Sequence, residues 1–521
     1  MSDTQTISET MDMGNALLQG NWSFFAEPVK YPLIIPYLLL FANGIIFGIA
    51  GLDFFALHQE IPFFIARFFS ILAGTAIIPL AFFTARLLAK RFGSAKPELA
   101  AVISAFFAAF SLLVFQFSRM ERPHIILGFF TLLSYFLYLR FAELPSKKNG
   151  LWLGIAVGLA AGTLQSGVLA VLFLILPLVF LFVRKKKPSD YWPVCCGLLI
   201  AAMIFFLSYP YLFLSPSEAL NLGSSFDPTF SGSRHDVSPF SGQGFYDILR
   251  NFLVYDPAIF ILMIISVILL GSARKRFVNF LRADALGIFS YSISFLLIFG
   301  LYNATFARFL IPLILFIIIL SGVAISEFIM RSRIGVIILS LLCLISLTQV
   351  MRMTFLLILP DTRDSATRWV KENLARENTI LIDTQNIANP IAKEAISRSR
   401  QLGGPVTRRD QLLLSLPDKD YPKDARNILR SWQLEIPDYE KFAEENDITH
   451  IVVSDGRGFR SSSNSLFAFA EKNFELREVF SPFRKRSNLV SSDFPDELSN
   501  PIIDLWGINR MGPEIRIYEK P

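Results

Sequence analysis

Residues 168–187 read Val168-Leu-Ala-Val-Leu-Phe-Leu-Ile-Leu-Pro-Leu-Val-Phe-Leu-Phe-Val-Arg-Lys-Lys-Lys187. An uncharged apolar run is followed directly by four cations. A membrane-spanning helix needs about 20 apolar residues, and cationic residues collect in cytoplasmic loops. The stretch therefore predicts a helix that ends at the cytoplasmic face of a membrane.

The same pattern repeats in both directions from this stretch, between Tyr31 and Leu359. Hydrophobic residues make up 53% of the chain and charged residues only 18%, against about 45–50% and about 25% in soluble domains. From Asp361 onward the sequence reads like an ordinary soluble protein. The composition predicts a polytopic α-helical membrane protein with a C-terminal soluble domain.

The apolar runs predict about ten transmembrane helices. The segment 151–183 is too long for one crossing and is interrupted at Gly162-Thr-Leu-Gln-Ser-Gly167, so we expect two short helices with a turn between them. The other expected crossings are residues 61–88, 98–117, 123–141, 191–213, 255–271, 286–303, 307–329 and 334–356.

Every second loop is basic, which predicts that these loops are cytoplasmic. Their cations are Arg86, Lys90, Arg91, Lys96, Arg140, Lys147, Lys148, Arg184 to Lys187, Arg274 to Arg276, Arg282, Arg331 and Arg333. The alternate regions then face outward: residues 118–122, the turn near Gln165, the loop 214–254 and everything after Thr354. We therefore expect a multi-pass protein of the cell (inner) membrane with an extracytoplasmic C-terminal domain.

Three regions follow from this orientation. Residues 1–30 form an acidic extracytoplasmic leader, 31–356 the transmembrane domain, and 357–521 the soluble domain. The segment 33–52 is short and rich in glycine, so we expect a juxtamembrane or re-entrant helix that leaves the leader outside.

The soluble domain alternates expected helices with expected strands, which predicts a small α/β fold. It contains no Gly-rich phosphate loop and no His/Cys cluster, so we interpret it as a lid or an acceptor-docking module. The expected helices are 365–374, 439–446 and 465–473, and the expected strands are 379–383, 449–453, 475–480 and 514–518.

The net charge of +6 does not indicate a nucleic-acid partner, because the cations lie mostly in short loops between apolar runs. The three cysteines, Cys195, Cys196 and Cys343, lie in apolar segments and are interpreted as free thiols. No ligand cluster demands a metal, so we expect no cofactor, although a divalent metal stays an open alternative.

Ser118-Arg-Met-Glu-Arg-Pro-His124 is the first candidate site. Arg119, Arg122 and His124 are packed into one short turn, and guanidinium groups match phosphate oxygens in a bidentate manner. The alternative is an Arg–Glu pair at a helix start with Pro123 in its first turn. The sequence leaves both interpretations open.

Three further candidates lie on the expected outer side. Arg308 is the lone cation at the end of an apolar helix, where the alternative is snorkelling to lipid headgroups. His235 lies in the polar loop 214–254, which has the length of a substrate loop. The leader carries Asp3, Glu9 and Asp12, any of which could act as a general base just above the membrane.

Taken in order, these motifs resemble the GT-C glycosyltransferases, the kind that includes dolichyl-phosphate-mannose protein mannosyltransferases and the aminoarabinose lipid A transferase. In place of the family's Asp-Glu pair the chain has Asp3-Thr4, followed by Lys30-Tyr-Pro-Leu33 for its Tyr-Pro element. Arg122-Pro-His124 stands for an Arg-Pro-Asp turn, Gly158 to Gln165 for a Gly-Leu…Thr-Lys hairpin, and Arg308-Phe-Leu-Ile-Pro312 for an Arg-Tyr-(apolar)-Pro motif.

The resemblance implies transfer of a sugar from a polyprenyl-phosphate donor to a lipid, glycan or protein acceptor on the extracytoplasmic side. It implies that Asp3 is the general base and that Arg119, Arg122 and Arg308 bind the lipid phosphate. Thr4, His124 and Gln165 depart from the family's pattern. In the family a first transmembrane helix precedes the catalytic loop, whereas Met1 stands directly before this leader.

Two other classes of function stay open. A transporter or lipid-glycan flippase would use broken helices around its site, and the interruption near Gln165 is such a feature. A non-catalytic assembly protein that kept the GT-C fold is the other, because Thr4 and His124 replace two acidic residues of the family.

Overall fold

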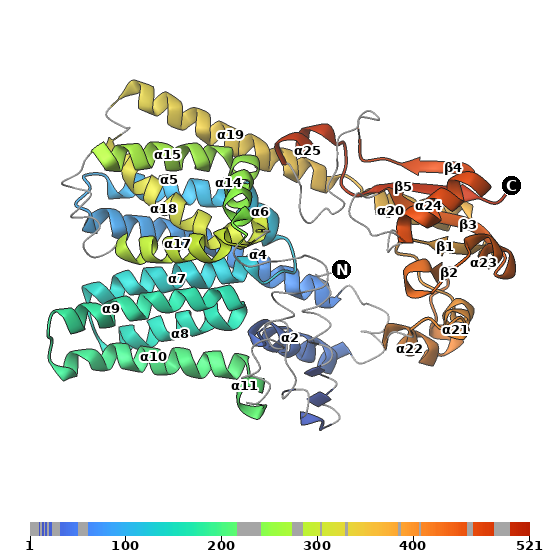
Figure 1. Ribbon diagram of the computed structural model, residues 1–521, viewed down its shortest axis with the longest axis horizontal. Helices are drawn as coiled ribbons and strands as arrows, with labels where there is room; N and C mark the ends of the chain where they lie inside the picture. The colour runs from blue at the N-terminus through green and yellow to red at the C-terminus, as the bar shows by residue number, and fades with distance from the viewer. Residues whose placement is uncertain are drawn as a thin grey trace. The chain divides into compact units, whose positions relative to one another are not determined.

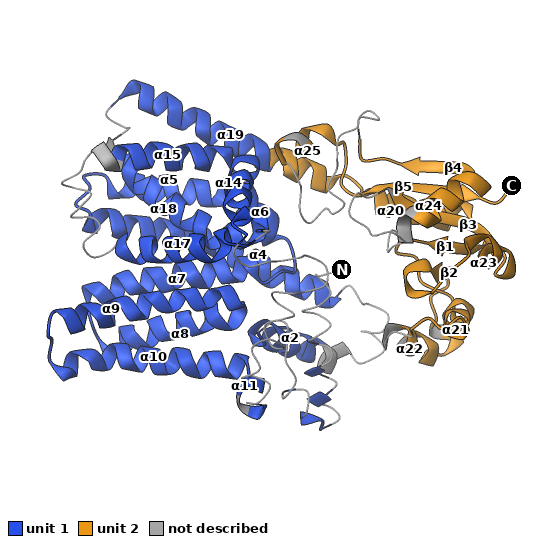
Figure 2. Ribbon diagram, in the orientation of Figure 1, with its two compact units in different colours: residues 1–350 blue, residues 351–521 orange. Residues whose placement is uncertain are grey.

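The structure is a computed structural model of the whole chain. It describes residues 10, 13–14, 16–17, 20–22, 25, 32–50, 61–215, 241–272, 285–302, 305–328, 332–383, 387–405, 408–455, 462–483 and 501–521. The chain forms two compact units, residues 1–350 and 351–521 (Figure 2).

Unit 1 is helical, and its longer helices run side by side (Figure 1). Its elements are α2 (Ile34–Ala50), α4 (Ile61–Arg91), α5 (Pro97–Phe110), α6 (Leu112–Ser118), α7 (His124–Glu143), α8 (Lys147–Thr163), η2 (Gln165–Val171), α9 (Leu172–Val183), α10 (Pro188–Ser208), α11 (Tyr211–Leu214), α14 (Gln243–Tyr255), α15 (Pro257–Ser272), α17 (Ala285–Gly300), η3 (Ala307–Leu310), α18 (Ile311–Phe328) and α19 (Arg333–Ile358).

Six helical segments among the described residues are long and apolar enough to cross a membrane. The number is eight if each of two bent helix pairs is one span: α5 with α6, bent by 56°, and α14 with α15, bent by 113°. The chain is therefore a polytopic helical protein, as the sequence predicted. The expected count of about ten crossings stays a prediction.

The apolar stretch 151–183 is two helices, as expected. Helix α8 ends at Thr163, Leu164 is extended, and η2 begins at Gln165. The new segment folds back on α8, because a Cβ added at Gly167 would lie 1.9 Å from the Ala160 carbonyl oxygen. The interruption at Gly162–Gly167 is therefore the turn of a hairpin.

The described parts of the basic loops of unit 1 lie at one end of the helices. Arg91, at the end of α4, donates a hydrogen bond to the Leu139 carbonyl near the end of α7 at 2.5 Å. Ser94 donates to the Glu327 carboxylate, near the end of α18, at 3.2 Å. We call this the basic end of unit 1. The turn 119–123 and the segment 305–310 lie at the opposite end.

Aromatic rings form the core of unit 1. Tyr135, Phe173, Tyr291 and Phe316 come from α7, α9, α17 and α18, and each has no more than 1% of its surface exposed. Their ring centroids lie 5.1–6.1 Å apart in the measured pairs. Because lipid is as apolar as these side chains, dense packing rather than exclusion of water favours such helix association.

Unit 2 is a five-stranded sheet covered by helices. Its elements after α19 are α20 (Thr362–Asn373), β1 (Thr379–Ile382), α21 (Lys393–Gln401), α22 (Arg408–Ser415), η5 (Asp418–Asp420), β2 (Asn427–Arg430), η6 (Ser431–Gln433), α23 (Tyr439–Glu445), β3 (Ile448–Asp455), α24 (Ser462–Asn473), β4 (Glu475–Phe480), α25 (Pro501–Gly507) and β5 (Glu514–Glu519).

The strands lie in the order β2-β1-β3-β5-β4, with the first three parallel and β5 antiparallel to both of its neighbours. One face of the sheet packs on α23 and α24 through Leu381, Ile451, Tyr518, Leu466 and Ala470. The seven helices and strands expected from the sequence are all present. Strand β2 and helices α21, α22 and α25 were not expected.

Arg352, near the end of α19, caps the last turn of α25. Its guanidinium donates hydrogen bonds to the Leu505 carbonyl at 2.8 Å and to the Ile508 carbonyl at 2.6 Å. The carbonyls at a helix end have no partner within the helix. The guanidinium also lies 5.7 Å from the ring of Trp506. The unit boundary lies within α19, after Val350, so Arg352 and α25 both belong to unit 2.

Gly74 allows α4 to approach the end of α6. A Cβ at this position would lie 2.1 Å from the Ser118 hydroxyl oxygen and 2.6 Å from its Cβ, but 3.5 Å from its Cα. We expect Gly74→Ala to lower the thermal stability of the protein by about 1–3 kcal/mol, the usual cost of overpacking. Adding Ser118→Gly should restore most of the lost stability, because it removes both the hydroxyl oxygen and the Cβ of Ser118.

The control for this pair is Gly44→Ala on α2, where an added Cβ meets nothing within 4 Å. Thermal unfolding of the purified full-length protein measures all variants. An equal loss of stability in Gly74→Ala with and without Ser118→Gly would contradict the contact between position 74 and Ser118.

His450 predicts an acid sensitivity of unit 2. Burial in β3 lowers the pKa of its imidazole, an effect that Glu519 opposes and Arg477 supports. The folded state therefore favours the neutral imidazole. The stability that His450 contributes is fully present above pH 6.5, the ordinary pKa of histidine, and is lost as the pH falls below that value. We expect hydrogen exchange of the β3 amides to accelerate from about pH 7.5 to about pH 5.5, after correction for intrinsic exchange. His450→Gln should remove the additional acceleration, and an unchanged pH profile in this variant would exclude His450 as its source.

Candidate functional site

Two segments that are distant in sequence meet at the end of unit 1 opposite the basic loops. One is the turn 119–123 between α6 and α7, and the other is the segment 305–310 before α18. The ring of His124, the first residue of α7, lies 5.5 Å from the ring of Phe309 and 6.3 Å from the ring of Phe117. The structure therefore brings the first two candidate sites together.

The turn is held against α4 and α6. Met120 is buried and donates its backbone N–H to the Phe117 carbonyl at 3.4 Å. The Glu121 carboxylate accepts a hydrogen bond from the Arg67 guanidinium of α4 at 2.8 Å, with only 10% of the Glu121 side chain exposed. The glutamate of the motif is thus bound to another helix.

Arg308 lies over aromatic rings. Its guanidinium carbon is 4.3 Å from the ring centroid of Phe306 and 5.3 Å from that of Phe309. Aromatic faces attract a cation, most strongly where water is scarce. The same Phe309 ring contacts His124, so Arg308 and the turn 119–124 share one aromatic neighbour.

Helix α14 holds the segment that carries Arg308. Asp247 accepts a hydrogen bond from the Thr305 backbone N–H at 2.9 Å, and Asn251 donates one to the Thr305 carbonyl at 2.9 Å. The Thr305 hydroxyl donates to the Phe299 carbonyl at 2.7 Å. Both backbone groups of Thr305 are therefore bound by side chains one helical turn apart on α14.

Asp256, between α14 and α15, holds the start of α6. Its carboxylate accepts hydrogen bonds from the Ser111 hydroxyl at 3.0 Å and from the backbone N–H groups of Leu112 at 2.8 Å and Leu113 at 3.2 Å. Only 1% of Asp256 is exposed. A carboxylate at a helix N-terminus satisfies N–H groups that have no partner within the helix.

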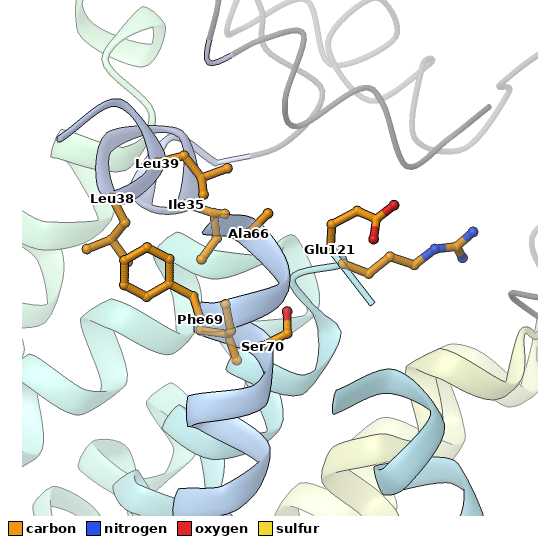
Figure 3. A pocket seen from close by; sticks show the side chains of 9 residues that line it. Ile35, Leu38, Leu39, Ala66, Phe69, Ser70 and Glu121 are labelled. Atoms are coloured by element: carbon orange, nitrogen blue, oxygen red, sulfur yellow. The ribbon is translucent and has the colours of Figure 1, made fainter. Parts of the chain in front are cut away.

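A small pocket lies beside the turn, between α2 and α4 (Figure 3). Its lining combines apolar side chains with Ser70, Glu121 and Arg122. Figure 3 shows the Glu121 carboxylate directed away from the apolar side chains. The remaining lining residues are Ile35, Leu38, Leu39, Ala66, Phe69 and Ile126.

The candidate residues named from the sequence divide into two groups. Arg119, Arg122, His124 and Arg308 are described and lie in the two segments that meet. His124 is 4% exposed and its ring packs between aromatic neighbours. Asp3, Glu9 and His235 lie outside the described residues, so their assignments stay predictions.

Sequence reasoning missed four residues around this site. Arg67 and Asp256 stand in or beside long apolar runs, where an ionisable residue is costly without a partner, and this signal could have found them. Asp247 and Asn251 have the i, i+4 spacing of one helix face. That spacing alone does not predict that they bind Thr305.

The described parts of the chain contain no group of three or more His, Cys, Asp or Glu side chains that could hold a metal ion. The chemistry that the described side chains can supply is instead cationic. Guanidinium groups on two adjoining segments are suited to bind a phosphate and to stabilise negative charge that develops on it.

The chain is similar to solved membrane transferases at low identity. The oligosaccharyltransferase of Archaeoglobus fulgidus, in the apo form, is 12% identical, with a TM-score of 0.44 over 92% of this chain and 69% of that chain. ArnT from Cupriavidus metallidurans in the apo state is 12% identical, with a TM-score of 0.44 over 91% of this chain and 90% of that chain. ArnT bound to undecaprenyl phosphate is 14% identical, with a TM-score of 0.43 and 91% of each chain covered.

The sequence itself gives one family match and no match among curated proteins. Residues 53–209 match the family model described as dolichyl-phosphate-mannose-protein mannosyltransferase. This segment includes helices α4 to α10, the turn 119–123 and the hairpin at Leu164. Over this segment the match confirms the resemblance to the GT-C glycosyltransferases that the motifs of the sequence indicated.

Proposed function

We propose that the protein transfers a sugar from a polyprenyl-phosphate donor to an acceptor on the extracytoplasmic side of the membrane. The observation that carries the proposal is the contact between the turn 119–124 and the segment 305–310, marked by the rings of His124 and Phe309. It places two guanidinium-bearing segments at the end of unit 1 opposite the basic loops.

A lipid phosphate is the ligand whose chemistry fits these cations. Arg119, Arg122 and Arg308 bind the phosphate of the donor in this proposal. When the sugar leaves, negative charge grows on the phosphate oxygens, and preorganised cations at low dielectric stabilise that charge. The family model that matches residues 53–209 is named for a sugar donor of this class.

The pocket beside the turn supports an amphiphilic ligand. Its lining residues include Arg122 and Ser70, whose buried hydroxyl has no hydrogen-bond partner among the described residues. Its wall is formed by apolar side chains of α2 and α4. We infer that Arg122 contacts the donor phosphate beside this mainly apolar lining.

The acceptor is activated by Asp3 in this proposal. A carboxylate that removes a proton from the attacking hydroxyl or amine is a general base, and Asp3 occupies the position that the family resemblance assigns to it. Glu9 and His235 are proposed to help place the donor or the acceptor. The unit 351–521 is proposed to lie outside the membrane, because the basic loops mark the cytoplasmic side.

A lipid-glycan flippase is the second candidate function. The two bent helix pairs, at 56° and 113°, favour it, because transporters build their sites around interrupted helices. Movement of a lipid-linked sugar across proteoliposomes, without its transfer to an acceptor, would establish this alternative.

Replacing Arg308 tests the phosphate contact. We expect Arg308→Ala to weaken binding of undecaprenyl phosphate by about tenfold to a hundredfold, the effect of losing a charge-assisted hydrogen bond. Arg308→Lys should recover part of the affinity, because it keeps the charge but not the planar fork. The control is Arg86→Ala at the basic end, where the guanidinium pairs with Glu98 at 2.7 Å. Equal affinity in the two alanine variants, measured in nanodiscs, would exclude Arg308 from the phosphate site.

Replacing Asp3 tests the general base. We expect Asp3→Asn to lower the rate of sugar transfer by about 100-fold or more while donor binding is unchanged, since general-base catalysis contributes about 10²–10⁴-fold. The measurement is single-turnover transfer from a polyprenyl-phosphate sugar to an added acceptor. Full activity of the variant would remove Asp3 from the mechanism.

A further inference from the structure

Helix α14 and the residue that follows it carry three polar side chains that bind other segments. Asp247 and Asn251 are four residues apart and bind Thr305, and Asp256 follows at the end of the helix. Asp247 and Asp256 are separated by about 14 Å along the helix, at 1.5 Å per residue. We call residues 243–256 the elbow, because α15 leaves it at 113°.

At one end, the elbow is bonded to α6. The break between α5 and α6 at Ser111 exposes the first N–H groups of α6. Asp256 accepts from Leu112 and Leu113, and the Ser111 hydroxyl accepts from Val114 at 3.2 Å while it donates to Asp256. Helix α6 has only two turns and ends at Ser118. Its N-terminal anchor therefore lies two turns from Arg119.

At the other end, the elbow is bonded to the segment that carries Arg308. Besides the two hydrogen bonds to Thr305, the Gly244 backbone N–H donates to the Tyr302 carbonyl at 2.6 Å. Gly244 is itself in close contact, since a Cβ there would lie 2.0 Å from the Phe299 carbonyl oxygen. Thr305 is three residues from Arg308, so the anchor fixes the backbone close to Arg308.

We propose that the elbow is a positioning element that holds Arg119 and Arg308 at a fixed separation, with Asp256 as its key positioning residue. The inference rests on the proposed function for the statement that both arginines bind one phosphate. Asp256 is about 145 residues from Ser111 in sequence, and Thr305 is 58 residues from Asp247. One rigid helix therefore ties together two segments that the chain itself leaves far apart.

The elbow has a physical advantage over direct pairing of the two segments. Both carry cations, which repel each other, and a phosphate site needs them close together before the ligand arrives. Asp247 and Asp256 accept hydrogen bonds from backbone N–H groups, and Asn251 donates one to a backbone carbonyl. These contacts hold the two segments.

Hydrogen exchange of the full-length protein in nanodiscs tests the coupling without any ligand. We expect Asp256→Asn to accelerate exchange about tenfold or more at residues 112–118, because an amide NH₂ replaces one acceptor oxygen. The proposal further requires faster exchange at residues 305–310, which Asp256 does not touch. Asp247→Asn should have the reciprocal effect on residues 112–118.

Two variants accompany this measurement. Ser111→Ala removes one of the three donors to Asp256 and serves as a milder change if Asp256→Asn does not fold. Leu262→Ala is the control for general destabilisation, because Leu262 is buried in α15 and is no part of the elbow's hydrogen bonds. It should lower thermal stability without selective acceleration at residues 305–310.

Binding of undecaprenyl phosphate then tests the purpose of the coupling. In the wild type, removing both Arg119 and Arg308 should weaken binding by a factor that differs from the product of the single losses, since both bind one phosphate. In Asp256→Asn, binding should be about tenfold weaker. In this background, the losses of affinity on replacing Arg119 and Arg308 should simply multiply. Leu262→Ala should keep the wild-type affinity.

The outcomes separate the two claims. Acceleration confined to residues 112–118 in Asp256→Asn would overturn the elbow, whether or not the lipid binds. Coupled exchange together with weaker binding supports it. If the variants show coupled exchange but the wild type does not bind polyprenyl phosphate, the mechanical coupling stands and the proposed donor site is overturned. Wild-type affinity in Asp256→Asn, with coupled exchange, would overturn the role of the elbow in binding.

Discussion

Backbone N–H groups cannot be left without partners inside a bilayer, and this constraint governs the arrangement of unit 1. Wherever a helix is interrupted at membrane depth, another part of the protein must supply the missing acceptor. At the break before α6, the acceptor is Asp256. The aspartate is itself costly in an apolar environment unless it is hydrogen-bonded. The interruption and the buried carboxylate therefore stabilise each other.

The interruptions also explain where the candidate site lies. Regular helices of unit 1 use their backbone groups internally and pack through aromatic rings and close glycine contacts. At the breaks near residues 111, 256 and 305, backbone groups are instead bound by the side chains of Asp256, Asp247 and Asn251. The segments that carry Arg119 and Arg308 both lie at the end of unit 1 opposite the described basic loops. The opposite end contains the basic loops and the Ser94–Glu327 contact.

Local patterns of the sequence predicted the helices and strands well, but not the contacts that build the site. The length of the apolar segment 151–183 and its interruption at Gly162–Gly167 predicted the break that the structure has at Leu164. The alternation of helix and strand patterns predicted β1, β3, β4 and β5. Strand β2 (Asn427–Arg430) was missed because it is short and has polar residues at both ends. The Arg67–Glu121 pair and the Asp256 contacts join residues 54 and about 145 positions apart. No local period encodes such pairings, so tertiary structure was needed to find them.

The last strand of the chain occupies an interior position of its sheet, and this affects how the protein is made. Strand β5 lies between β3 and β4. The carbonyls that bind Arg352 are also distant, 153 and 156 residues downstream of Arg352. During synthesis, the apolar part of α19 is available to the membrane before any of these partners exists. The sheet of unit 2 can therefore close only after residues 514–519 have been synthesised. A chain truncated before β5 would have the helices of unit 1 but an incomplete sheet in unit 2. The edges of β3 and β4 would then both be exposed to pairing with other strands.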